Sequence, residues 1–142
     1  MKKQVLFISL AVILLLSACS QSEEEKIRAY LEDYSFYDIL IDFKEGELNI
    51  EVQMFEPEDN DIAQLDVVVE TKALLESVKK YSNEHLNLIK EVNLYFITRE
   101  TNEIVAEINA NNSTILGTTW VELDRYDLPQ IVDGYKFYGV SN

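Results

Sequence analysis

The sequence predicts an α+β fold, in which an antiparallel sheet of four to five strands from two hairpins carries two helices on one face. Two segments in each half of the chain alternate apolar and polar residues, which is the pattern of half-buried strands. A turn separates the members of each pair, and hairpins form antiparallel sheets. Between the pairs lies a long stretch with one apolar stripe at helical spacing. A single layer of helices over one sheet face is the simplest arrangement that buries this stripe.

Residues 1–18 have the composition of a secretory leader. Lys2 and Lys3 precede an almost unbroken apolar stretch over residues 5–16, which matches the charged and apolar regions of a signal peptide. This stretch is well short of the roughly 20 apolar residues that a membrane-spanning helix needs. It ends in the run Leu16-Ser17-Ala18-Cys19, which contains the only cysteine of the chain.

This four-residue run resembles the lipobox of bacterial lipoprotein precursors. The resemblance implies that lipid is attached to the Cys19 thiol and that a signal peptidase cleaves between Ala18 and Cys19. Small residues let a peptidase approach the backbone, and a thiolate is a natural acceptor for alkylation. The alternative is a secreted protein with an incidental free thiol.

The resemblance divides the chain into three parts. We expect a signal peptide over residues 1–18, a lipid anchor and short tether over residues 19–22, and a single α+β domain over residues 23–142. The expected location is the extracytoplasmic face of the cell membrane, with the acylated Cys19 in the bilayer. With no other cysteine in the chain, the domain would contain no disulfide.

The charge of the chain restricts its partners. The chain has 12 basic and 26 acidic residues and a net charge of −14. The leader contains Lys2 and Lys3 and no acid, so its removal would bring the net charge to −16. Such a chain is not expected to bind nucleic acid through its phosphates, and an anionic membrane surface would repel it. Its hold on the membrane would therefore come from lipid.

The domain is expected to begin with a helix and a hairpin. Ser22 and Glu25 have the spacing of a capping box, and an apolar stripe follows through residues 27–34. The helix would start about four residues after the lipid, which places the domain close to the bilayer. Residues 39–43 and 48–54 alternate as strands around a glycine turn at residues 44–47, and Pro57 ends the pairing.

A second helix and a second hairpin are expected to follow. Asp61-Ile62-Ala63-Gln64 reads as another capping box, and the helix is predicted over residues 62–84 because its period outweighs the strand preference of three consecutive valines. Residues 92–96 and 104–108 alternate around a turn at residues 99–102. A fifth strand is predicted over residues 115–121, with Gly117 as a bend. Residues 123–142 receive no assignment.

The sequence contains little that indicates catalysis. The only histidine, His85, is expected at the end of the second helix, where the helix dipole favours it. The acidic loop at residues 56–61 fails as an EF-hand because Ala63 and Gln64 occupy positions that need a ligand and a glycine, although a different calcium site there stays open. With 26 acids, a pair of carboxylates carries almost no information. We therefore predict no catalytic residue, no metal site and no cofactor.

Aromatic residues are concentrated in the last quarter of the chain: Trp120, Tyr126, Tyr135, Phe137 and Tyr138. They suit either the margin of a small core or a surface for a partner or ligand. The leading hypothesis is a membrane-anchored, non-enzymatic protein-binding or accessory module of the cell envelope, with an envelope protein as its partner. The alternative is a solute- or glycan-binding lipoprotein that uses these aromatics. An enzyme that uses carboxylates alone is a weaker third hypothesis.

Overall fold

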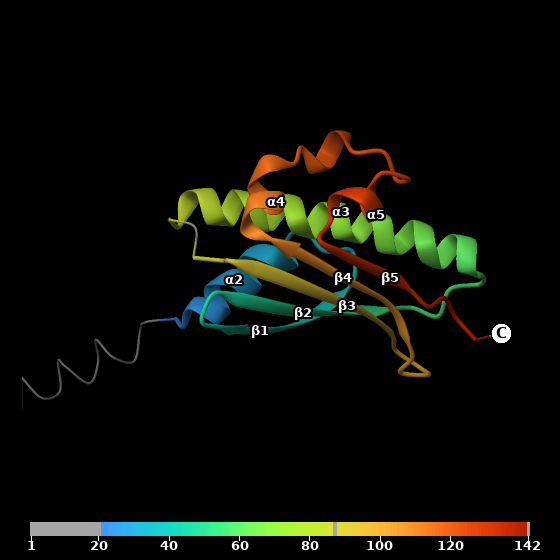
Figure 1. The fold of residues 1–142 in the computed structure, drawn as a ribbon. Coiled ribbons are helices and arrows are strands. Elements are labelled where there is room, and N and C mark those ends of the chain that lie inside the picture. Colours follow the sequence, from blue (N-terminus) through green and yellow to red (C-terminus); the bar gives the residue numbers. More distant parts are fainter. Residues whose placement is uncertain (1–20, 87, 142) are drawn as a thin grey trace, which may run out of the picture.

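The computed structural model describes residues 21–86 and 88–141, and within them the chain forms an α+β fold with one five-stranded sheet and four α-helices (Figure 1). The elements in chain order are α2 (Glu23–Glu32), β1 (Asp38–Lys44), β2 (Glu47–Met54), α3 (Asn60–Glu84), β3 (Glu91–Thr98), β4 (Ile104–Asn111), α4 (Asn112–Gly117), the 3₁₀ helix η1 (Trp120–Glu122), α5 (Leu128–Ile131) and β5 (Gly134–Phe137). The leader and the lipobox residues Leu16, Ser17, Ala18 and Cys19 lie outside the described residues. Within the described ranges, no helix has the length and apolarity needed to cross a membrane.

The sheet is mixed, so the prediction of an antiparallel sheet is wrong in one pairing. The strand order is β1-β2-β3-β4-β5, and both predicted hairpins are present as antiparallel pairs. β2 and β3, however, pair in parallel, with Ile50 opposite Leu94. The reason is α3, which at 25 residues is about 37 Å long. It carries the chain back to the end of the sheet where β2 began, as a parallel crossover requires.

The capping box of α2 is confirmed. The Ser22 hydroxyl accepts a hydrogen bond from the Glu25 amide at 3.2 Å, and the Ser22 amide donates to Glu25 Oε2 at 3.0 Å. The helix also protects the outer edge of β1, because Arg28 donates to the Ile41 carbonyl and the Phe43 amide donates to Glu24, both at 3.4 Å. An edge strand whose polar groups are occupied is a poor template for another chain.

The predicted cap of α3 is displaced by two residues. Asp59 is the N-cap, with an extended backbone and a side chain that accepts from the Ile62 amide at 2.8 Å. Asp61 lies instead in the first turn, where a carboxylate suits the helix dipole. The helical assignment of the valine run is confirmed, since Val67 and Val68 are buried on the sheet side of α3.

The chain after β4 differs from the prediction. Residues 115–121 form no strand but belong to α4 and η1, because the Asn111 side chain caps a helix by accepting from the Thr114 amide at 3.0 Å. The fifth strand is β5, which pairs with β4 in the previously unassigned tail. Four α-helices are therefore present among the described residues, where two were predicted.

One face of the sheet holds the core. Buried positions alternate along β2 and β3, with Ile50, Val52, Leu94 and Phe96 all inaccessible to solvent. α3 covers them, and Figure 1 shows α4 and α5 on the same side as α3. The alternate residues of the strands therefore form a second face.

Candidate functional site

The second face of the sheet, here called the open face, is mainly polar, with a few exposed apolar residues such as Leu40 and Ile104, and carries no helix of the described chain. Its residues are the outward positions of β1 to β5, which are exposed or half-buried. The helices contact one another on the other face, where α3 meets α2, α4 and η1. A sheet with only one covered face presents its other face to solvent.

Three asparagines form a hydrogen-bonded row across the three central strands on the open face, near one end of these strands. Asn93 is the register partner of both Asn49 and Asn109. Asn109 Nδ2 donates to Asn93 Oδ1 at 2.7 Å, and Asn93 Nδ2 donates to Asn49 Oδ1 at 3.0 Å. The row also holds two carboxylates in place, since Glu47 and Glu91 accept from Asn93 and Asn109 at 3.0 and 2.5 Å. These side chains are therefore ordered before any partner arrives.

The open face is negatively charged. Its strand positions hold the six carboxylates of Asp38, Asp42, Glu47, Glu51, Glu91 and Glu107, against the two lysines Lys44 and Lys136. Arg99 lies at the margin, where it pairs with Asp38 and donates to the Gln53 carbonyl at 3.1 Å. The summed field of such a surface attracts cations and repels anions.

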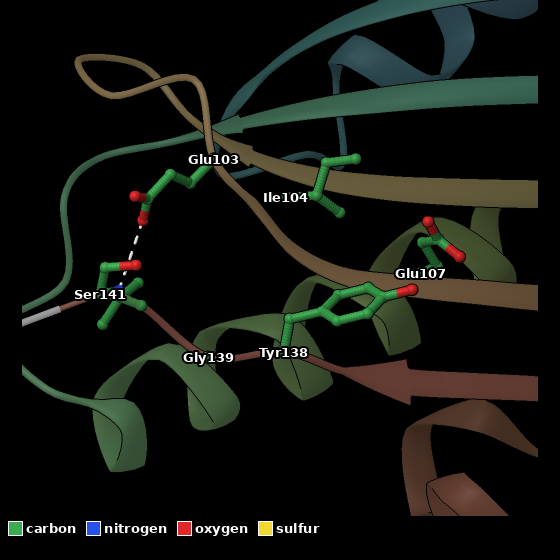
Figure 2. Close-up of a pocket in the computed structure, with 7 residues that line it drawn as sticks. Glu103, Ile104, Glu107, Tyr138, Gly139 and Ser141 are labelled. Atoms are coloured by element: carbon green, nitrogen blue, oxygen red, sulfur yellow. Dashed lines mark hydrogen bonds between the residues drawn. The ribbon is translucent and has the colours of Figure 1, made fainter.

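A groove runs along β4 on this face and consists of two hollows that share Glu107. One hollow, of about 220 Å³, lies against Tyr95, Asn109 and Lys136. The other, of about 490 Å³, lies against Glu103, Ile104 and Tyr138. Figure 2 shows the second hollow, with Tyr138 and Glu107 at one end and Glu103 and Ser141 at the other. We call the two hollows together the β4 groove, defined by Tyr95, Glu103, Glu107, Asn109, Lys136 and Tyr138.

Local backbone features create the β4 groove. Gly134 is the register partner of Asn109, and a Cβ at Gly134 would lie 3.3 Å from the Asn109 Cβ, so a side chain there would fill the hollow. The register of β3 and β4 also shifts beside Val105. The Val105 carbonyl accepts from the amides of Tyr138 and Gly139 at 2.8 and 3.3 Å. A bulge of this kind redirects nearby side chains, and here it holds the tail beside β4.

A buried carboxylate lies on the opposite side of the sheet. Glu70 of α3 is inaccessible to solvent. It bonds to the Ser35 hydroxyl and accepts from the Phe36 amide at 3.0 Å. Desolvation by burial raises the pKa of Glu70, and this outweighs the two hydrogen bonds, which lower it. These bonds tie α3 to the segment between α2 and β1, which is a structural role.

The structure does not bring the five predicted aromatic residues together. Trp120 is fully buried, and its indole N–H donates to the Ile115 carbonyl at 3.0 Å, so it belongs to the core. Tyr135 and Phe137 are half-buried against the core from β5. Tyr126 is 69% exposed but lies near the first turns of α3. Two of the five line the β4 groove: Tyr135 lies at the smaller hollow, and Tyr138, with 56% of its surface exposed, lies at the larger one.

The other sequence candidates have structural partners. His85 caps α3, where its ring stacks on Tyr81 at 4.0 Å between centroids and its Nδ1 lies 3.0 Å from the Tyr81 carbonyl. In the acidic loop, Asp59 caps α3 and Glu56 accepts from the amides of residues 100 and 101. Among residues 21–86 and 88–141, no group of three or more His, Cys, Asp and Glu side chains is arranged to hold a metal ion.

The sequence reasoning missed most residues of the β4 groove. Tyr95 and Glu107 occupy outward positions of predicted strands, so their exposure could have been inferred from the alternation. Their proximity follows from the predicted hairpin, in which Tyr95 is the register partner of Glu107. Lys136 and Tyr138 join them through β5 and the tail, which were not predicted. No family model, no curated protein and no solved structure matches this chain.

Proposed function

We propose that the protein is a lipid-anchored, non-enzymatic accessory protein of the cell envelope, which docks a basic protein partner on the open face of its sheet. The observation that carries the proposal is the charge of this face, where six carboxylates face solvent against two lysines. Charge complementarity favours a partner with a basic patch, speeds its association and disfavours acidic competitors.

The lipid anchor is the second part of the proposal. It rests on the lipobox resemblance at residues 16–19 and on the start of α2 at Glu23, four residues after Cys19. Four extended residues reach at most roughly 14 Å. The tether would therefore hold the domain close to the bilayer, where it meets membrane-associated partners at high local concentration.

A non-enzymatic role agrees with the contacts of His85 and Glu70, whose side chains are of the types that most often perform acid–base chemistry. The ring of His85 is stacked on Tyr81 and its Nδ1 contacts a backbone carbonyl. The Glu70 carboxylate is enclosed in the core and bonded to Ser35 and Phe36. Both side chains are therefore held by contacts within the fold.

In-cell photo-cross-linking of the full-length protein tests this proposal. A photoreactive residue replaces Leu40, which is 54% exposed on the open face, or Val121, which is 72% exposed on η1 and serves as the matched control. The proposal predicts one envelope protein captured from position 40 and not from position 121, through a peptide rich in arginine and lysine. Capture should fall in a Cys19→Ala form. Equal capture from both positions, or capture through acidic peptides only, would contradict the docking face.

A further inference from the structure

We infer that the β4 groove receives an arginine side chain of the basic partner, an inference that rests on the proposed docking of such a partner on the open face. A guanidinium binds best where a carboxylate accepts its paired N–H groups and aromatic rings pack against its plane. Glu107 provides the carboxylate, and Tyr95 and Tyr138 provide the rings.

The sheet register places these three side chains beside one another. Tyr95 on β3 is the direct partner of Glu107 on β4. Lys136 on β5 is the partner of Glu107 on the other side, and Tyr138 lies two residues further along on the same face. Tyr95 is 36% exposed and Tyr138 is 56% exposed, so both rings are accessible to a partner. Glu107 borders both hollows, at the point where they meet.

Lys136 occupies the place of the incoming cation. Its Nζ lies 3.6 Å from Glu107 Oε2, and its side chain is 68% exposed. A surface ion pair of this length contributes little and is easily exchanged. A guanidinium that makes two hydrogen bonds to Glu107 would displace the single ammonium contact, and the exposed lysine would then move into solvent.

The chain itself shows how arginine behaves on its surface. The guanidinium of Arg99 lies 4.6 Å from the centre of the Phe55 ring, and that of Arg125 lies 4.7 Å from the centre of the Tyr126 ring. Both are cation–π contacts on exposed rings. Arginine favours such stacking more than lysine does, because its charge is planar and weakly hydrated.

The test uses a fluorescent peptide in which arginines alternate with glycines, and a second peptide with lysine at the same positions. Binding of each to the full-length protein in detergent micelles is measured by fluorescence anisotropy at low and high salt. The groove predicts that the arginine peptide binds about threefold more tightly than the lysine peptide. Glu107→Gln and Tyr138→Ala should each weaken the arginine peptide by about three- to tenfold. Lys136→Gln should strengthen it by about twofold, because it removes the competing cation.

Glu122→Gln is the matched control, since Glu122 is exposed on η1, away from the groove. It changes the net charge as Glu107→Gln does and should alter affinity by less than about twofold. Equal losses from the two glutamate variants, together with equal affinity for the two peptides, would mean that net charge alone binds them. A weaker arginine complex in Lys136→Gln would likewise overturn the inference. Either result leaves the open face as a docking surface, which the cross-linking at position 40 decides separately.

Discussion

Glu70 should make the stability of the domain depend on pH in a direction opposite to that of an ordinary paired carboxylate. Burial raises its pKa above the usual 4.5, so the folded chain holds this proton more tightly than the unfolded chain does. The stabilisation from this group is therefore complete below pH 4.5, and it is lost as the pH rises from there through the raised pKa. The hydrogen bonds from the Ser35 hydroxyl and the Phe36 amide favour the ionised carboxylate, but burial outweighs them.

Two substitutions at position 70 separate the charge from the hydrogen bonds. Glu70→Gln keeps an acceptor for the Phe36 amide, adds a donor and cannot ionise. Its stability relative to wild type should therefore increase as the pH rises above 4.5 and through the raised pKa of Glu70. Glu70→Ala leaves the Phe36 amide without an acceptor, which costs about 1–3 kcal/mol, and leaves a cavity that costs about 1 kcal/mol more. Its loss of about 2–4 kcal/mol should be largest near pH 4.5 and smaller at higher pH, where the buried charge is removed.

Urea unfolding followed by circular dichroism at several pH values measures these differences. Glu122→Gln, at an exposed position, serves as the control for net charge. If the stability difference between Glu70→Gln and wild type stays constant with pH, or if it falls as the pH rises, then the carboxyl of Glu70 does not carry the pH dependence and the reasoning is refuted.

Three further predictions concern the fold and are checked by the same urea experiment. Asp59→Ala should lower the free energy of unfolding by about 1 kcal/mol because it removes the cap of α3, whereas Asp61→Ala should lower it by less than about 0.5 kcal/mol. The reverse order would indicate that Asp61 is the cap, as predicted from the sequence. Asn93→Ala should lose about 1–2 kcal/mol because it interrupts the asparagine row, and a loss no larger than that of Gln53→Ala would mean that the row adds nothing. Gly46→Ala should lose about 1–2 kcal/mol, because Gly46 has φ +93° and a Cβ there would lie 2.9 Å from the Lys90 side chain; unchanged stability would show that the turn relaxes at no cost.

The sequence predicted those elements whose signal is local. The alternation of residues 48–54 and 92–96 and the long stripe of residues 62–84 identify strands and a helix, because the period of buried side chains depends only on the element itself. The capping box at Ser22 was found for the same reason, since its two hydrogen bonds join residues three apart.

The features that the sequence did not predict depend on contacts between residues far apart in the chain. The parallel pairing of β2 with β3 is set by where the 25-residue α3 returns the chain, which hairpin patterns do not indicate. β5 has only four residues and begins at Gly134, so it lacks a periodic signal and forms because β4 offers a free edge. Residues 115–121 are apolar enough for a strand, but the Asn111 cap and the burial of Trp120 turn them into helix and loop.

The candidate site likewise combines features that the local sequence predicts with features that depend on distant contacts. Exposure of Tyr95, Glu107 and Asn109 follows from strand alternation, whereas the β4 groove exists because Gly134 lies beside Asn109 and the tail bonds to the Val105 carbonyl. Of the five aromatic residues concentrated in the last quarter, only Tyr135 and Tyr138 line the groove. Composition alone does not distinguish Tyr138 from the buried Trp120.

The association rate of the partner captured through position 40 tests the central claim most directly. Two double variants with the same net charge are compared, Glu51→Gln with Glu91→Gln on the open face and Glu84→Gln with Glu122→Gln on the helical side. Docking on the open face predicts that the first pair lowers the association rate by about fivefold at low salt and weakens its salt dependence, while the second pair changes the rate by less than about twofold. Equal effects of the two pairs would contradict docking on the open face.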